Sequence, residues 1–175
     1  VAHELGHAFW YATGNESGTG EARALNEGNG DVIGGLVTLY RGTGLGEGSQ
    51  VRHFPMFGGW RGRVVNPFGY TATDDNDVEW VGFKYWSPII ELGEEHVGGL
   101  PFGRAVVYLA EGAPADQANQ LWCVNFPDGL GGIGITRAAQ IWHYAVAYCI
   151  VGSPDYTDMR AAFLTAAQML YGVGS

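Results

Sequence analysis

The feature that most constrains the fold is a long helical pattern, at residues 21–40, that is interrupted by Gly28-Asn29-Gly30. Its apolar residues recur at three- and four-residue steps, as on one face of a helix. They are Ala24, Leu25, Val32, Ile33, Leu36, Val37 and Tyr40. A glycine inside a helix costs about 1 kcal/mol relative to alanine. We therefore expect another segment or a ligand to approach this helix closely at its middle.

The remaining periodic stretches are also helical, which predicts a mainly α fold. They comprise residues 1–13, 101–111, 135–151 and 154–171, the last ended by Gly172. Residues 41–100 are rich in Gly, Pro and Asp and have little periodicity. So long an irregular segment is uncommon in a compact domain and usually carries function. A second glycine loop is expected at residues 129–134.

Composition excludes several classes of protein. The 175 residues are 46% hydrophobic, which suits one globular domain or one lobe of a larger protein. The formal net charge of −9 is unsuited to binding nucleic acid or an anionic membrane surface. No apolar run approaches the roughly 18 residues of a membrane span. Glycine is abundant, at 29 residues, but the 13% aromatic content argues against a disordered chain.

The first chemical motif is His3-Glu4-Leu5-Gly6-His7. Positions i and i+4 share one face of a helix, so both imidazoles can reach one metal ion. Glu4 can hold an attacking water without being a ligand itself. The alternative is a pair of histidines on a helix that binds no metal.

Two carboxylates on the second helix extend this motif. Catalytic zinc sites often use two histidines and one glutamate and leave a fourth position open, and Glu27 can supply the glutamate. Asp31 lies one turn later and can accept the free ring N–H of a ligand histidine. Both acids could instead simply face solvent, but an unpaired carboxylate in this apolar, glycine-rich stretch would be costly.

With these residues the sequence resembles the thermolysin-like zinc metallopeptidases. The specific part is the spacing, since nineteen residues separate His7 from Glu27. Related aminopeptidases typically have one residue fewer. The resemblance implies zinc ligands at His3, His7 and Glu27, a general base at Glu4, and Asp31 as the residue that orients a ligand.

The resemblance continues in the stretch Glu94-Glu95-His96-Val97-Gly98-Gly99-Leu100-Pro101. It implies that His96 donates a hydrogen bond to the tetrahedral intermediate. An acidic residue upstream fixes this histidine in the family, and ungapped counting favours Glu91, with Glu94 as the fallback. An arginine that grips a substrate carbonyl is expected at Arg61, with Arg63 as the second choice.

The sequence also departs from the family. The tyrosine that usually stabilises the oxyanion is missing, and Tyr11 could replace it only if the loop after it differs. Thr38 stands where many members have a calcium-binding carboxylate, so calcium is not expected at the usual double site. The run at residues 74–77 could bind calcium separately, although a solvated loop is the favoured interpretation.

The resemblance therefore implies a zinc endopeptidase that acts on peptide or protein substrates and is secreted. Residues 1–175 would form the helical C-terminal lobe of this gluzincin-type enzyme, and a β-rich N-terminal domain of the same enzyme and a pro-segment would precede it. The implied secretion favours a disulfide between Cys123 and Cys149, and two buried thiols are the alternative. Neither nucleic acid nor a membrane is expected as a partner. A zinc aminopeptidase and a non-catalytic zinc-binding lobe remain the alternatives.

Overall fold

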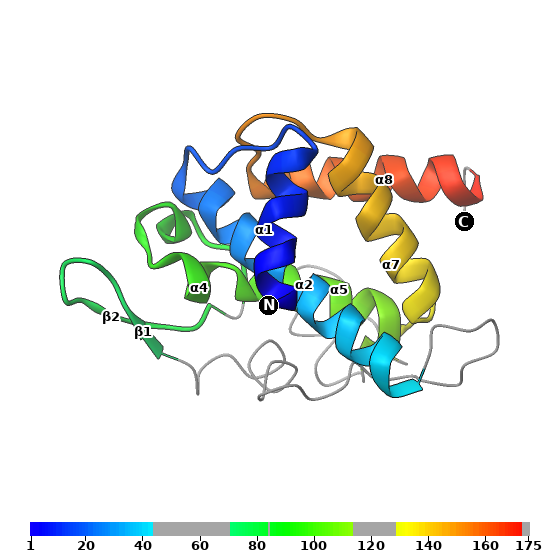
Figure 1. Cartoon of the computed structure of the whole chain (residues 1–175), viewed down its shortest axis with the longest axis horizontal. Helices are drawn as coiled ribbons and strands as arrows, with labels where there is room; N and C mark the ends of the chain where they lie inside the picture. Colours follow the sequence, from blue (N-terminus) through cyan, green and yellow to red (C-terminus); the bar gives the residue numbers. More distant parts are fainter. Residues whose placement is uncertain (44–70, 84, 114–128, 173–175) are drawn as a thin grey trace.

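The structure is a computed structural model, and it describes residues 1–43, 71–83, 85–113 and 129–172. Helices dominate these residues, as the periodicity predicts, so the prediction of a mainly α fold is confirmed. In Figure 1, helices α1 and α2 cross in the middle of the molecule. A small hairpin lies on one side of this crossing, and helices α7 and α8 lie on the other.

Helices α1 (Ala2–Ala12) and α2 (Gly20–Thr43) match the first two predicted helices. They cross in close contact, because a Cβ atom added to Gly6 would lie 2.5 Å from the Cα atom of Gly30. The side chain of Asn29 donates a hydrogen bond of 2.8 Å to the carbonyl oxygen of Gly6 at the same crossing. The expectation that the glycines of the second helix permit a close approach is thus confirmed.

The other glycine of that helix lies against the segment that follows the irregular region. A Cβ atom on Gly28 would lie 2.9 Å from the carbonyl oxygen of Gly99, between α4 (Glu95–Gly98) and α5 (Leu100–Glu111). Helix α5 begins with a proline in its first turn and ends at Gly112, where φ is +81°. Glycine adopts this left-handed backbone without the steric cost that other residues incur. The glycines of α2 therefore let the backbone of Gly6 and Gly99 approach the helix closely, and Gly28 also accommodates the ring of Phe102, whose Cδ1 atom would lie 2.7 Å from a Cβ atom at Gly28.

The irregular region contains only short elements where it is described. Strands β1 (Thr71–Thr73) and β2 (Glu79–Val81) form an antiparallel hairpin in which Ala72 is opposite Trp80. A 3-10 helix, η2 (Pro88–Leu92), precedes α4. After α5, strands β3 (Gly112–Ala113) and β4 (Leu130–Gly131) pair antiparallel, which places a short strand in the predicted glycine loop.

The C-terminal part differs from the predicted pair of helices in one detail. Helix α7 (Ile135–Tyr144) continues into a π-helical turn, η3 (Ala145–Cys149), rather than as one α-helix to residue 151. The carbonyl oxygen of Val146 accepts a hydrogen bond of 3.2 Å from the side chain of Asn15, a partner outside the helix. Helix α8 (Tyr156–Tyr171) begins with a capping box and ends at Gly172, where φ is +92°.

The hydrophobic core lies among the five longer helices. Its largest fully buried side chains are contributed by α1, α2, α5 and the turn after α7: Trp10, Leu25, Val32, Leu39, Leu100, Val106, Val107 and Val146. Met159, Ala162 and Ala166 bring one face of α8 into the same core. None of the described helices has the length and apolar character of a membrane span. The core fixes α2 between α1 and α5, and this arrangement determines which side chains meet at the helix crossing.

Candidate metal centre

The crossing of α1 and α2 brings together three of the predicted ligands, His3, His7 and Glu27. The two Nε2 atoms lie 3.0 Å apart. The carboxylate of Glu27 places one oxygen 3.2 Å from His3 Nε2 and the other 3.6 Å from His7 Nε2. Tetrahedral zinc, with ligand bonds of about 2.0–2.1 Å, would require donor atoms about 3.3–3.4 Å apart. The donor set and its spacing thus fit a tetrahedral metal ion.

Glycine at the crossing shapes this cluster directly. A Cβ atom on Gly30 would lie 2.8–3.0 Å from three atoms of the His3 imidazole, closer than ordinary contacts allow. The imidazole therefore occupies the space that a side chain at position 30 would fill. The two glycines that weaken the sequence pattern are used differently, since Gly28 accommodates the ring of Phe102 and the backbone of Gly99, whereas Gly30 accommodates the ring of a predicted ligand.

Both histidines have a polar partner on the ring nitrogen that faces away from the cluster. His3 Nδ1 lies 3.1 Å from Asp31 Oδ1, in the arrangement that the sequence predicts for Asp31. His7 Nδ1 lies 3.0 Å from Asn26 Oδ1, and Asn26 is buried. With each Nδ1 atom engaged, the two Nε2 atoms are the nitrogens that face Glu27. Sequence reasoning gave Asn26 no role, although its position directly before Glu27 was the available signal.

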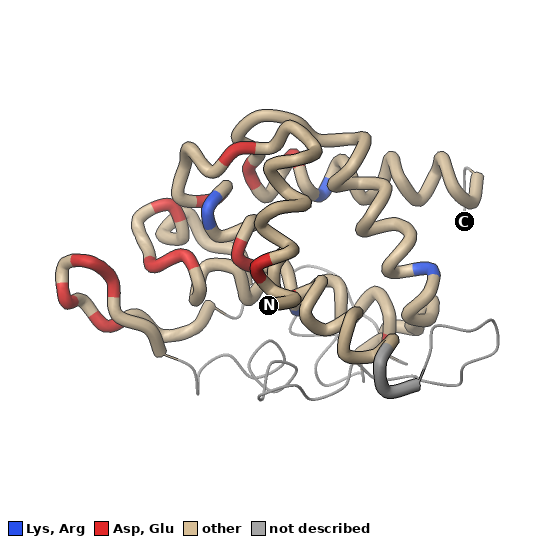
Figure 2. Tube along the Cα trace, in the orientation of Figure 1, with Lys and Arg blue, Asp and Glu red and all other residues tan. Residues whose placement is uncertain are grey.

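Electrostatics in the cluster favour a positive charge. Hydrogen bonds to Asp31 and then to Glu27 raise the pKa of His3 from 6.5 to about 10. Burial alone would raise the pKa of Glu27, but the hydrogen bond from His3 and the charges of His96 and His7 outweigh it, and the pKa is lowered. Figure 2 shows acidic positions around the hairpin loop, around η2 and α4, and where α1 meets α2. The same field that retains a proton on His3 would attract a metal cation.

Glu4 and His96 reach this region from different elements. Glu4 lies in the first turn of α1 with its side chain exposed to solvent. His96, on α4, places Nε2 3.3 Å from a carboxylate oxygen of Glu27, and about half of its side chain is exposed. A histidine from the α4 segment thus lies beside the cluster formed by α1 and α2.

The acidic partner of His96 is Glu94 and not Glu91, which corrects the first choice made by counting. Glu94 precedes α4 and contacts His96 Nδ1 with one carboxylate oxygen, while the other accepts a hydrogen bond of 3.0 Å from the amide of Val97. The contact with Glu94 raises the pKa of His96 to about 9. Glu91 belongs to η2 and accepts a hydrogen bond of 2.9 Å from the amide of Glu21. The chain leaves the 3-10 helix η2 after Leu92 and turns before α4, so counting residues along the sequence did not predict which glutamate reaches His96.

Tyr11 does not take the place of the missing oxyanion tyrosine. Its hydroxyl lies 3.3 Å from Ser17 Oγ and 3.3 Å from the side-chain nitrogen of Asn26. These contacts place the hydroxyl beyond Asn26, on the side of His7 that carries Nδ1, whereas the cluster faces Nε2. The structure therefore assigns Tyr11 to the polar network behind His7.

The other predicted residues fall outside the cluster or outside the described residues. Arg61, Arg63 and Cys123 lie outside the described residues, so the disulfide between Cys123 and Cys149 stays a prediction. Cys149 has no disulfide partner among the residues that the structure describes. In the acidic run at residues 74–77, Asp74 accepts hydrogen bonds from the amides of Asn76 and Val78 and from the indole of Trp80. These bonds give Asp74 a role in closing the hairpin loop. They do not test calcium binding by this run, which stays a prediction.

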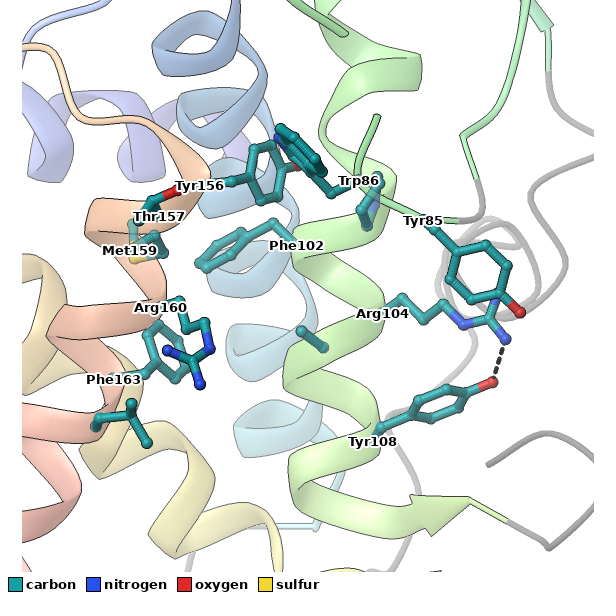
Figure 3. A pocket seen from close by; sticks show the side chains of 13 residues that line it. Tyr85, Trp86, Phe102, Arg104, Tyr108, Tyr156, Thr157, Met159, Arg160 and Phe163 are labelled. Atoms are coloured by element: carbon teal, nitrogen blue, oxygen red, sulfur yellow. Dashed lines mark hydrogen bonds between the residues drawn. The ribbon is translucent and has the colours of Figure 1, made fainter. Parts of the chain in front are cut away.

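A pocket of about 540 Å³ lies elsewhere, along α5 and α8 (Figure 3). It is lined mainly by apolar and aromatic side chains, including Phe102 and Phe163, whose rings meet edge to face. Arg104 lies beneath the ring of Tyr85 and donates a hydrogen bond of 2.6 Å to the hydroxyl of Tyr108. None of the predicted metal or catalytic residues lines this pocket, so it is separate from the cluster.

Comparison with curated proteins identifies relatives along the whole chain. Neutral protease B of Bacillus subtilis is 27% identical over 184 residues, which cover 100% of this chain and 29% of that protein. Thermolysin of Alicyclobacillus acidocaldarius is 25% identical over 174 residues, which cover 98% of this chain and 29% of that protein. The chain is homologous to the thermolysin-like proteases. No family model matches it.

The similarity to thermolysin-like proteases extends well beyond the histidine motif. A transglutaminase-activating metalloprotease of Streptomyces mobaraensis is 26% identical over the whole of this chain and 23% of its own length. The resemblance that the motif spacing indicated is thus confirmed. The chain spans less than a third of the length of these thermolysin-like relatives.

Proposed function

We propose that this chain is the helical, metal-binding C-terminal lobe of a secreted zinc endopeptidase. The observation that carries the proposal is the cluster of His3, His7 and Glu27, whose donor atoms are 3.0–3.6 Å apart on two crossing helices. The relatives named as neutral proteases and thermolysin support a protease, and one is named a metalloprotease.

His3, His7 and Glu27 would hold the zinc ion, each imidazole through Nε2. When bound, zinc would act as a Lewis acid on the scissile carbonyl and lower the pKa of a water molecule. Asp31 and Asn26 hold the two imidazoles by their Nδ1 atoms, at 3.1 and 3.0 Å, so the ligand nitrogens keep their direction.

Glu4 is the general base. It follows His3 in the first turn of α1, and its exposed carboxylate is free to take a proton from the attacking water. The same carboxylate then returns the proton to the leaving amine. Because Glu4 is not among the three grouped donors, its loss should reduce turnover without removing the metal.

His96 stabilises the negative charge that develops on the carbonyl oxygen. The contact with Glu94 holds its Nδ1 atom and raises its pKa to about 9, so its imidazole is protonated at neutral pH. A protonated imidazole donates from Nε2, the atom that lies beside Glu27 at the edge of the cluster. Arg61 is proposed to hold the substrate carbonyl, as the sequence resemblance implies.

The complete enzyme is proposed to include an N-terminal domain that forms the other wall of the substrate cleft. The greater length of the relatives supports this. Peptide or protein chains are the proposed substrates.

The test is replacement of Glu4 by Gln in the full natural protein. Zinc content should stay near one ion per chain, while cleavage of a peptide with both termini blocked should fall by about 10²–10⁴-fold. Glu16→Gln, which alters an exposed glutamate in the loop after α1, is the matched control and should change neither quantity.

Three outcomes would contradict the proposal. Wild-type activity in the Glu4→Gln variant would exclude Glu4 as the base. Cleavage only of peptides with a free N-terminus would indicate an aminopeptidase. One zinc ion per chain with no cleavage by the wild-type protein would indicate a non-catalytic zinc-binding lobe.

A further inference from the structure

A short hydrogen-bond network lies behind His7 and includes Asn26, the residue that holds the Nδ1 atom of His7. Asn26 turns its carbonyl oxygen to His7 Nδ1, at 3.0 Å. Its amide nitrogen donates to the hydroxyl of Tyr11 at 3.3 Å and to Ser17 Oγ at 3.0 Å. The Tyr11 hydroxyl in turn donates to Ser17 Oγ at 3.3 Å. The network joins α1, the following loop and α2.

Counting protons shows why this network favours one orientation of the Asn26 amide. In the orientation observed, the two amide protons and the Tyr11 hydroxyl proton make three hydrogen bonds among the three side chains. If the amide were reversed, its carbonyl oxygen would face the hydroxyls. Only the two hydroxyl protons would then be available, so at most two bonds could form. The bond that the reversed orientation loses is the one between the Tyr11 and Ser17 hydroxyls, so the preference for the observed orientation amounts to about one hydrogen bond.

The orientation of the amide decides which nitrogen of His7 carries the proton. A carbonyl oxygen at Nδ1 requires a proton on Nδ1, and the lone pair is then on Nε2, which faces His3 Nε2 at 3.0 Å. A reversed amide would donate to Nδ1 and place the proton of the neutral ring on Nε2. That proton would block the nitrogen that faces the cluster.

We infer that Tyr11 and Ser17 are positioning residues that hold the Asn26 amide so that His7 presents an unprotonated Nε2 to the metal. The inference rests on the proposed zinc site. Tyr11 lies one helical turn after His7 on α1, so the residue that follows the ligand on its own face also helps to set its tautomer. Neither residue is among the three grouped donors.

The test measures zinc affinity by competition with a chromophoric chelator. Tyr11→Phe combined with Ser17→Ala should leave the two orientations of the Asn26 amide equally populated and weaken zinc binding about twofold, because only about half of the chains then present an unprotonated Nε2. Each single change leaves one hydrogen bond in either orientation by the same count, so it should also weaken zinc binding about twofold. Tyr40→Phe is the control, because it removes the hydroxyl of a tyrosine on α2 that is 65% exposed, and it should have no effect.

The decisive comparison uses Asn26→Asp. A carboxylate offers an acceptor to His7 Nδ1 in either orientation, so Tyr11→Phe and Ser17→Ala should cause no loss of zinc affinity in this background. If the two residues act only through packing, the loss would be the same in both backgrounds, and the inference would be wrong. The nitrogen shifts of the His7 ring in the metal-free protein, measured by NMR, should show Nδ1 protonated with Asn26 and a mixture of tautomers in the double variant.

These outcomes separate the inference from the proposed function. A wild-type chain that binds no zinc would refute the zinc site and the inference together. A wild-type chain that binds zinc, with a double variant of equal affinity and an unchanged His7 tautomer, would refute the inference alone. If the double variant does not fold, as judged by circular dichroism, the single variants decide the matter by the same criteria.

Discussion

Replacing Gly30 by alanine should separate the stability of α2 from its ability to bind metal. Alanine is the better helix former by about 1 kcal/mol, so the intrinsic effect on α2 is favourable. The new methyl group would, however, lie 2.8 Å from Cε1 and 2.9 Å from Nδ1 of the His3 imidazole. We expect the variant to fold as well as the wild-type chain and to bind zinc more weakly.

The size of the loss follows from the distance that the ring must move. Ordinary contacts of a Cβ atom begin near 3.4 Å, so the closest ring atom, at 2.8 Å, must shift by about 0.6 Å. Zinc–ligand distances tolerate deviations of only about 0.2 Å. The ring is also held by Asp31 and Glu27, and a shift weakens both contacts. Disturbing the support of one ligand typically costs about 10–100-fold in metal affinity, which is the loss we expect.

The assay is competition for zinc with a chromophoric chelator, together with urea unfolding of the metal-free chain followed by circular dichroism. Gly34→Ala is the matched control, because it gives α2 the same gain in helix propensity and its Cβ atom would meet only the backbone nitrogen of His3, at 3.9 Å. Equal zinc affinity in the Gly30 and Gly34 variants would refute the argument that position 30 must be empty to accommodate the ligand.

Three further predictions follow from the structure. The pKa of His96 is raised to about 9 chiefly by Glu94, so protonated His96 should stabilise the metal-free fold fully below pH 6.5 and lose this contribution as the pH rises through about 9. In an NMR titration, Glu94→Gln should return the pKa of His96 towards 6.5, and an unchanged pKa would contradict the assigned partner. Gly99→Ala should lower the free energy of unfolding, measured in urea, by about 1–3 kcal/mol, because its Cβ atom would lie 2.7 Å from the carbonyl oxygen of Ala24. The control is Gly131→Ala, whose Cβ atom would have no neighbour within 4 Å and which should have little effect. Asp155→Ala, which removes the capping box of α8, should cost about 1 kcal/mol by the same measurement, and no change would show that the cap is dispensable.

The placement of His96 shows where local reasoning stops. Its position before a helix was evident from the sequence, and the structure does place it beside Glu27. Its acidic partner was assigned to Glu91 by counting, whereas the chain turns between η2 and α4 and brings Glu94 to the imidazole. Counting fails in such a turn because the direction of a side chain there depends on backbone dihedral angles and not on a fixed helical period.

The sequence by itself determined the local features of this protein. Helical periodicity located α1, α2, α5 and α8 to within a few residues, because the pattern of apolar residues repeats with the turn of the helix. The i, i+4 spacing of His3 and His7 placed both imidazoles on one face, and Gly28-Asn29-Gly30 indicated that something must approach α2 closely.

Only the tertiary structure decided what approaches that helix. Packing of α1 across α2 brings the ring of His3 into the space left by Gly30, and Asn26 and Asp31 to opposite sides of the cluster. These contacts join residues 19–28 positions apart in the sequence. Their geometry depends on the angle and depth at which two helices cross, which the core as a whole determines and no single segment encodes.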